Sequence, residues 1–234
     1  MYKRILLKLS GEQLSGKYES GIDPELGCWI AEEVKKVADS NIQVVIMVGG
    51  GNYVRGAQIA GHGIKRVTGD HMGMLATMIN ALALTDIFEA NNVQTRCLSN
   101  IFAEQVAEPF VFRLANKHLQ AGRVVIVAGG IGRPYLTTDT AAVSLALEMD
   151  CDVVLKATKV DGVYTKDPAK YDNAERISSM SFQEAVENSD ISVMDKAALG
   201  LAMEQQMPVV VFDALQADNL KKVALGEALG TRIG

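Results

Sequence analysis

Basic residues beside glycine-rich turns are the features of this 234-residue sequence that are best suited to chemistry. Lys8 lies in the first apolar run, Arg55 follows the triglycine Gly49–Gly51, and Arg133 lies inside the turn Gly129–Pro134. Successive backbone N–H groups can cradle an anion, and a guanidinium group can bind two phosphate oxygens at once. A tight exit from a strand is the structural alternative for three consecutive glycines, which cost backbone entropy. Together the turns predict a site for two phosphorylated ligands or for one long one.

The segment that begins at Gly11 imitates a P-loop but fails two of its requirements. It fits G-x-x-x-x-G-K, yet Tyr18 stands where a Ser or Thr must hold Mg²⁺. A P-loop also passes directly into a helix, whereas the next strong helix start is Asp23-Pro24. The triglycine is not a Rossmann fingerprint either, because Val54 occupies the place of the last glycine. The phosphate site must therefore belong to another fold.

Apolar runs typical of strands alternate with segments of helical periodicity. This alternation predicts an α/β fold with a mostly parallel sheet, helices on both faces and ligands beyond the carboxyl ends of the strands. The long segment Asp70–Ala90 is apolar around most of its circumference, so it is either a buried central helix or a subunit interface. The expected strands are 5–9, 42–48, 93–98, 123–128, 152–156, 209–213 and a short terminal run. The expected helices start at Asp23-Pro24 or cover 70–90, 138–149, 181–187, 195–206 and 217–225.

The composition is that of a folded protein, with 48% hydrophobic residues, 22% charged residues and a net charge of −5. A mildly acidic balance argues against a broad nucleic-acid-binding surface. The three cysteines, Cys28, Cys97 and Cys151, are far apart and odd in number, which predicts reduced core thiols in a cytoplasmic protein. Met1–Ser10 lacks a signal-peptide cleavage site, and no apolar stretch approaches ~20 residues, so we expect no membrane span.

Several longer motifs, in order along the chain, resemble the bacterial uridylate kinases of the amino acid kinase superfamily. They are Lys8–Gly11, Gly49–Gly56, Gly69–Ala76, Thr137–Ala142, Lys156–Pro168 and Val193–Asp195. The resemblance implies a three-layer αβα sandwich formed by a single domain, 1–234, and assembled as a homohexamer. It implies the reaction ATP + UMP → ADP + UDP with Mg²⁺, a cytoplasmic step of pyrimidine nucleotide biosynthesis. It also places UMP over residues 1–150 and ATP over residues 151–234, approximately.

The resemblance assigns roles residue by residue. The expected catalytic residues are Lys8, Arg55, Lys156, Asp139 and Asp195. The expected ATP-binding residues are Lys8, Leu9, Ser10, Gly11, Gly51, Arg55, Thr158, Tyr164 and Asp167. The expected UMP-binding residues are Gly50, Asp70, Ile131, Gly132, Arg133, Pro134, Tyr135, Leu136, Thr137 and Thr138. The segment Gly16, Lys17, Tyr18, Glu19, Ser20 and Gly21 overlays a GTP effector site of some family members, where GTP activates and UTP inhibits. No direct protein ligand to a metal is assigned.

Some details of the acceptor site depart from the family or stay open. The family commonly has Thr at the place of Ile131 and Asn at that of Arg133, which bears on the choice of base. Asp70 is either a helix N-cap or a ligand of the ribose hydroxyls. An acceptor phosphate has its second pKa near ~6, so it is already a nucleophile and needs no general base. We therefore expect no catalytic role for the histidines, which are His62, His71 and His118.

Two other functions compete with this one. The first is a kinase of the same superfamily that phosphorylates a carboxylate or carbamate, which would not need Asp70 for a ribose. The second is a nucleotide-binding storage or regulatory protein without catalysis, which would lack the cationic clamp. The presence of Lys8, Arg55 and Lys156 favours an enzyme.

Overall fold

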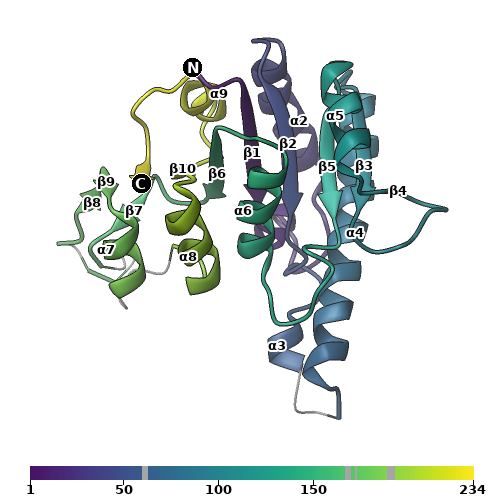
Figure 1. Cartoon of the computed structure of the whole chain (residues 1–234), viewed down its shortest axis with the longest axis horizontal. Helices are drawn as coiled ribbons and strands as arrows, with labels where there is room; N and C mark the ends of the chain where they lie inside the picture. The colour runs from purple at the N-terminus through teal and green to yellow at the C-terminus, as the bar shows by residue number, and fades with distance from the viewer. Residues whose placement is uncertain (60–62, 167–169, 172, 189–192) are drawn as a thin grey trace.

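A central sheet with helices on both faces forms the protein, according to a computed structural model that describes residues 1–59, 63–166, 170–171, 173–188 and 193–234 (Figure 1). Within these residues the sheet has nine strands, and all neighbouring pairs are parallel except β10 and β11. In spatial order the strands are β4 (Glu108–Pro109), β3 (Thr95–Ser99), β5 (Val124–Ala128), β2 (Gln43–Val48), β1 (Arg4–Leu9), β6 (Val153–Thr158), β10 (Val209–Asp213), β11 (Thr231–Ile233) and β9 (Ser179–Met180). A separate antiparallel pair joins β7 (Val163–Tyr164) to β8 (Arg176–Ile177).

Two layers of helices enclose the sheet, which confirms the αβα arrangement predicted from the sequence. One layer holds α2 (Pro24–Ala38), α4 (Arg66–Ala90) and α9 (Asn219–Ala224). The other holds α5 (Phe112–Gln120), α6 (Thr138–Glu148), α7 (Phe182–Glu187) and α8 (Lys196–Gln205), and α6 and α8 lie on the near side of the sheet in Figure 1. Successive strand residues point to opposite faces. Accordingly Leu7 belongs to the first core and Leu6 to the second.

The start of α4 differs from the prediction. The helix begins at Arg66, after Lys65 in extended conformation, so Asp70 lies one turn inside the helix and is not its N-cap. The earlier start brings α4 against the short helix α3 (Gly56–Ile59), because a Cβ on Gly69 would lie 2.8 Å from the carbonyl oxygen of Gly56. The other helix start that the sequence marks is confirmed, since the Asp23 side chain accepts a hydrogen bond from the Glu25 N–H.

Helix α4 has one buried face and one exposed apolar face. Its buried residues include Met78, Leu84 and Phe88, which pack in the core of the first layer. By length and composition alone α4 could cross a membrane, yet 44% of its most apolar window is buried inside the protein. Leu75 and Ile79 are about half exposed, at 51% and 49%. Helix α4 is therefore a core helix that keeps part of its apolar surface uncovered in a single chain.

The short elements were not predicted from the sequence. These are α1 (Gly11–Leu14), α3, α5 and the two-residue strands β4, β7, β8 and β9. Apart from α5, these segments contain too few residues for a periodic pattern. Helix α5 has nine residues and one buried face, with Ala115, His118 and Leu119, so its pattern was available but was not recognised. The short helix α1 does not restore the P-loop interpretation, because Lys17 and Tyr18 lie after the end of α1 and before the start of α2.

Candidate active site

A cavity of about 410 Å³ lies at the carboxyl ends of β1 and β2, where the topology predicts a ligand site. Predicted ATP-binding residues and predicted UMP-binding residues both line it. From the predicted donor side it is lined by Lys8, Ser10, Gly11, Gly51 and Arg55. From the predicted acceptor side it is lined by Gly50, Asp70, Ile131, Leu136, Thr137 and Thr138. Asp139 and Asp195 line it as well.

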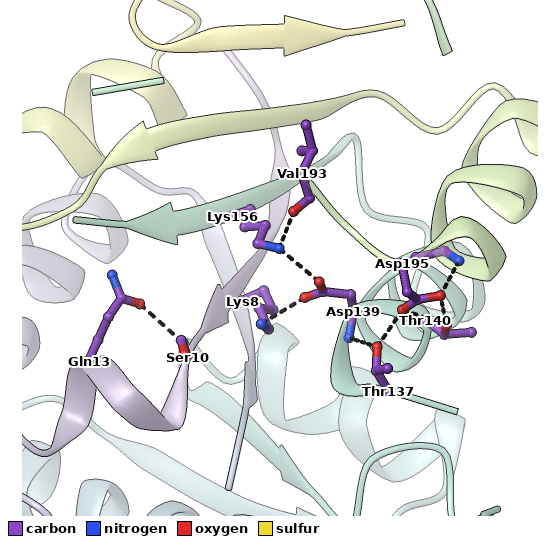
Figure 2. Close-up of polar contacts among 10 residues, drawn as sticks. Lys8, Ser10, Gln13, Thr137, Asp139, Thr140, Lys156, Val193 and Asp195 are labelled. Atoms are coloured by element: carbon purple, nitrogen blue, oxygen red, sulfur yellow. Dashed lines mark hydrogen bonds and ion pairs between the residues drawn. The ribbon is translucent and has the colours of Figure 1, made fainter. Parts of the chain in front are cut away.

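Lys8 and Asp139 form the charged floor of this cavity, and Lys156, which does not itself line the cavity, contacts Asp139 (Figure 2). The parallel register of β1 and β6 puts Lys8 and Lys156 side by side, and both side chains point to the face that α6 covers. Asp139, in the first turn of α6, meets them there: its Oδ1 lies 2.7 Å from the Lys8 Nζ and its Oδ2 lies 2.7 Å from the Lys156 Nζ. The side chains are only 9–15% exposed. Strand register and one helix N-terminus thus concentrate two positive charges around one carboxylate.

The pKa shifts of the cluster follow from this geometry. Burial alone would raise the pKa of Asp139, but the neighbouring charges of Lys8 and Lys156 outweigh it and hold that pKa below its ordinary value. Burial lowers the pKa of Lys156, against the attraction of Asp139. The Lys156 Nζ also donates to the carbonyl of Val193. The carboxylate is thus an anion held between cations, which suits neutralisation of further negative charge and does not suit proton abstraction.

Asp195 ties the starts of α6 and α8 together beside the floor (Figure 2). Its carboxylate caps α8 by accepting from the Ala198 N–H at 3.0 Å. It also accepts hydrogen bonds from the hydroxyls of Thr137 and Thr140, and Thr137 itself caps α6. Asp195 therefore fixes the helix that carries Asp139.

The glycine turns are packed against each other and against α4. A Cβ on Gly11 would lie 2.6 Å from the Gly51 nitrogen, and a Cβ on Gly50 would lie 2.7 Å from the Gly73 carbonyl oxygen. Only a hydrogen fits at these positions, so close backbone packing is one reason for the glycines. Gly51 differs, since its added Cβ would meet nothing nearer than 3.4 Å, the Glu12 side chain. Gly51 is therefore the glycine of this turn with room for a side chain, although all three glycines line the cavity.

Arg55 and Asp70, both predicted ligand residues, already have protein partners. The guanidinium of Arg55 forms an ion pair with Glu12, and both side chains are about half exposed. Asp70 accepts from the Arg66 Nε at 2.8 Å and from the backbone N–H of Tyr135 at 2.9 Å. Glu12, Arg55, Arg66 and Asp70 all line the cavity, so a ligand there would meet these ion pairs.

Several predicted residues lie away from this cavity. Gly132 and Arg133 line a second hollow of about 510 Å³, and Ile131 lines both hollows. Pro134 and Tyr135 line neither. Leu9 is buried, so it can offer a nucleotide only its backbone.

On the predicted donor side, Thr158 donates to the carbonyl of Phe212 at 3.0 Å, and the Tyr164 hydroxyl donates to Asp161 at 2.6 Å. Neither residue lines the main cavity. Asp167 lies outside the described residues.

The predicted effector segment, 16–21, connects α1 to α2 outside the cavity. Lys17 pairs with Glu25 at 2.7 Å, and Gly21 exchanges two hydrogen bonds with Asn52. Asn52 in turn forms a buried amide pair with Asn80 of α4, and the Asn80 side chain donates to the Gly49 carbonyl. This network links the segment to the triglycine turn.

Four residues of the site were missed by sequence reasoning. Glu12 and Arg66 line the cavity, Thr140 holds Asp195, and Asn80 holds the triglycine. Arg66 carried a usable signal, because it precedes Asp70 by one helical turn, the spacing of an ion pair. Among the described residues no group of three or more His, Cys, Asp or Glu side chains is placed to hold a metal. His118 is buried, lies between Glu108 and Arg123 and does not line the cavity, and His62 lies outside the described residues.

The chain belongs to the amino acid kinase family, whose pattern it matches over residues 3–213. Among curated relatives, it is 45% identical over 230 residues to the uridylate kinase of Dichelobacter nodosus (strain VCS1703A), covering 98% of this chain and 95% of the relative. The crystal structure of UMP kinase from Bacillus anthracis matches with a TM-score of 0.94 and 37% identity, covering 100% of this chain and 96% of the other. UMP kinase from Ureaplasma parvum matches with a TM-score of 0.91 and 31% identity, covering 100% and 99%. These findings confirm the family resemblance seen in the sequence motifs.

Proposed function

We propose that this chain is a UMP kinase, which transfers the γ-phosphoryl group of ATP to UMP and yields ADP and UDP. The observation that carries the proposal is the pair of lysines held by Asp139, with Lys8 and Asp139 lining a glycine-rich cavity. The similarity over the full chain to uridylate kinases supports the choice of UMP as the acceptor. The rival acceptors, carboxylates and carbamates, lack a ribose for Asp70 to recognise.

This site neutralises phosphate charge and aligns the two nucleotides. Two nucleotides bring several negative charges to one point, and transfer requires that these charges be balanced and the reacting oxygens be in line. Lys8 and Lys156 supply fixed positive charge in a partly buried site, where it acts more strongly than in water. The phosphate of UMP is itself the nucleophile, so no side chain has to remove a proton. This agrees with the ionised state of Asp139 between its lysines.

We assign the ligands as follows, on the basis of the cavity lining and the family resemblance. ATP phosphates bind near Lys8, the Ser10–Gly11 turn, Gly51 and Arg55, and the adenosine extends toward Thr158, Tyr164 and the segment that contains Asp167. UMP binds near Gly50, Asp70 and the loop 131–138. Residues 1–150 then form the acceptor part of one domain and residues 151–234 its donor part, approximately.

Mg²⁺ is proposed to enter with ATP. The cavity is lined by four carboxylates, and each is engaged: Glu12 by Arg55, Asp70 by Arg66, Asp139 by lysines, and Asp195 by hydroxyls and an N–H group. This donor set fits Mg²⁺ that is held mainly by phosphate oxygens and water, as is usual for this ion. When bound, the ion would supply positive charge that neutralises part of the phosphate charge.

Assembly, regulation and location belong to the same proposal. We propose a homohexamer in which the exposed apolar face of α4 contributes to a subunit interface, since Leu75 and Ile79 are about half exposed. We further propose that the enzyme acts in the cytoplasm, in pyrimidine nucleotide biosynthesis, and binds neither nucleic acid nor membrane. GTP activation through 16–21 and UTP inhibition are proposed from the family resemblance.

The test is an ADP-release assay with ATP and a panel of acceptors: UMP, CMP, dUMP, acetylglutamate and carbamate. The proposal predicts that UMP is by far the best acceptor, and equal rates for all five would refute it. A second arm compares Lys8→Met with Lys3→Met, a matched control because Lys3 is exposed at the far end of the same β1 region. Lys8→Met should lower kcat at least about 100-fold, since it removes charge that stabilises the transferring group. Full turnover in Lys8→Met would contradict the lysine assignment.

A further inference from the structure

Arg66 and Asp70, one turn apart on α4, hold the loop between β5 and α6. The Arg66 Nε donates to both carboxylate oxygens of Asp70, at 2.8 and 3.0 Å. The backbone N–H of Tyr135, in the loop, donates to the Asp70 Oδ2 at 2.9 Å. The guanidinium carbon of Arg66 lies 5.3 Å from the centre of the Tyr135 ring, within the range of a cation–π contact. The loop is thus held both by its backbone and by a side chain, and in Figure 1 it runs down beside α3 and the start of α4.

The backbone at Tyr135 requires such a restraint. Its φ is +68°, in the left-handed region that a residue with a Cβ seldom adopts. Such a conformation persists where the surroundings impose it. The side chain of Tyr135 is 66% exposed, so packing against the core does not impose it. The contacts to Asp70 and Arg66 are the restraints that the structure provides.

The Asp70 carboxylate is fixed from the opposite side as well. It abuts α3, because a Cβ on Gly56 would lie 2.7 Å from the Asp70 Oδ1. Its side chain is only 13% exposed, against 41% for Arg66. A carboxylate offers about four lone-pair sites, and the three hydrogen bonds from Arg66 and Tyr135 leave one for a further donor. Asp70 can therefore hold the loop and still accept a hydrogen bond from a ligand.

We propose that Arg66 is a positioning residue of the acceptor site, which acts through Asp70 to hold loop 130–137 in the shape that receives the acceptor nucleotide. Arg66 and Asp70 both line the main cavity, as do Leu136 and Thr137 at the end of the loop. The proposal rests on the proposed function for the identity of the acceptor. The restraint on the loop does not depend on that identity.

The first experiment measures amide hydrogen exchange of loop 130–137 in the full chain without nucleotide. Arg66→Ala is compared with Lys65→Ala, which removes a positive charge from the neighbouring exposed position. Exchange in the loop should become about five- to tenfold faster in Arg66→Ala, the factor of an ordinary hydrogen bond, because solvent screens this partly exposed ion pair. It should stay unchanged in Lys65→Ala. Arg66→Lys, which keeps the charge but loses the planar fork, should fall between the two. Equal exchange in wild type and Arg66→Ala overturns the proposal.

The second experiment compares KM values. In Arg66→Ala the KM for UMP should rise about five- to tenfold, whereas kcat and the KM for ATP should stay near their wild-type values. Lys65→Ala, the exposed matched control, should leave all three values unchanged. A rise in both KM values together would indicate a general disturbance of the fold and would overturn the positioning role.

The two experiments separate this proposal from the proposed function. If the wild-type chain does not phosphorylate UMP, the proposed function fails, and the exchange measurement still decides whether Arg66 and Asp70 restrain the loop. If wild type phosphorylates UMP but Arg66→Ala changes neither exchange nor the KM for UMP, only the positioning role fails.

Discussion

Replacing Asp139 by Asn should destabilise the protein far more than removing either lysine that it binds. The variant keeps the shape of the side chain but removes the one charge that separates Lys8 from Lys156. All three side chains are at most 15% exposed, so water can screen the two ammonium groups only weakly. Breaking a buried ion pair from one side costs about 3–5 kcal/mol, because the remaining charge is left without a partner.

Lys8→Met should cost less, since Asp139 keeps its ion pair with Lys156 at 2.7 Å. We expect a loss of about 2 kcal/mol, the contribution of one hydrogen bond to a charged group. The double variant Lys8→Met/Asp139→Asn should be no less stable than Asp139→Asn alone, because it also removes the like charge that the single variant exposes. The two effects should therefore fail to add.

The assay is urea denaturation of wild type, both single variants and the double variant. Asp39→Asn serves as the surface control, and its free energy of unfolding should stay within about 0.5 kcal/mol of wild type. In thermal melts the loss in Asp139→Asn corresponds to a lower Tm by roughly 6–20 °C for a chain of this size. Additive losses in the double variant, or wild-type stability in Asp139→Asn, would refute the idea that the carboxylate separates two buried charges.

The same cluster predicts a pH dependence. The pKa of Asp139 is lowered in the folded protein from its ordinary value of 3.8, because the charges of Lys8 and Lys156 outweigh burial. The carboxylate therefore contributes its full stability above pH 3.8, and the contribution is lost as the pH falls through the folded-state pKa. The stability difference between wild type and Asp139→Asn should shrink over that acidic range. A difference that grows on acidification would contradict the direction of the shift.

Three further changes test other parts of the site. Glu12→Gln releases Arg55 from its ion pair, so the Kd for ADP measured by calorimetry should fall about two- to fivefold; weaker binding would mean that Glu12 positions Arg55 instead. Asp195→Ala removes a helix cap and the acceptor for two hydroxyls, and should lower the free energy of unfolding by about 2 kcal/mol in urea titrations, a loss that Asp195→Asn should recover in part. Asn80→Ala removes the donor to the buried Asn52 Oδ1 and to the Gly49 carbonyl, so a loss of about 2–3 kcal/mol is expected. An unchanged Tm would show that the amide pair contributes nothing.

Much of the fold follows from the sequence, because its long strands and helices have clear patterns. The run Gln43–Val48 is buried almost completely and reads as a continuous apolar segment, as a central parallel strand should. The cap at Asp23 is likewise local, so it was predicted to the residue. The start of α4 was not, because Arg66–Gly69 carries no cap and becomes helical through contact with α3. That contact joins two glycines, and close glycine packing leaves no periodic signal.

The candidate site was predictable in its parts but not in its connections. The glycine turns and the basic residues stand out in the sequence, and Lys8, Arg55 and Gly51 do line one cavity. Which carboxylate meets which cation depends on strand register and on where a helix docks. The ion pairs of Lys8 with Asp139 and of Arg55 with Glu12 therefore needed the structure. The left-handed backbone of Tyr135 also needed the structure, because tyrosine seldom adopts this conformation and its presence does not predict one.

The register that pairs Lys8 with Lys156 also has a consequence for how the chain matures. Strand β1 is made first, yet its neighbour β6 is made only after residue 152, so this pairing closes a very long loop. Contacts between residues so distant in sequence form late and slow the search for the native topology. During synthesis the charge of Lys8 stays unbalanced until Asp139 has been made, and Lys156 joins the cluster only with β6. In a ribosome-bound fragment that ends before β6, one edge of β1 would be unpaired and Lys156 would be absent. The chain should therefore become able to bind phosphate abruptly, late in translation.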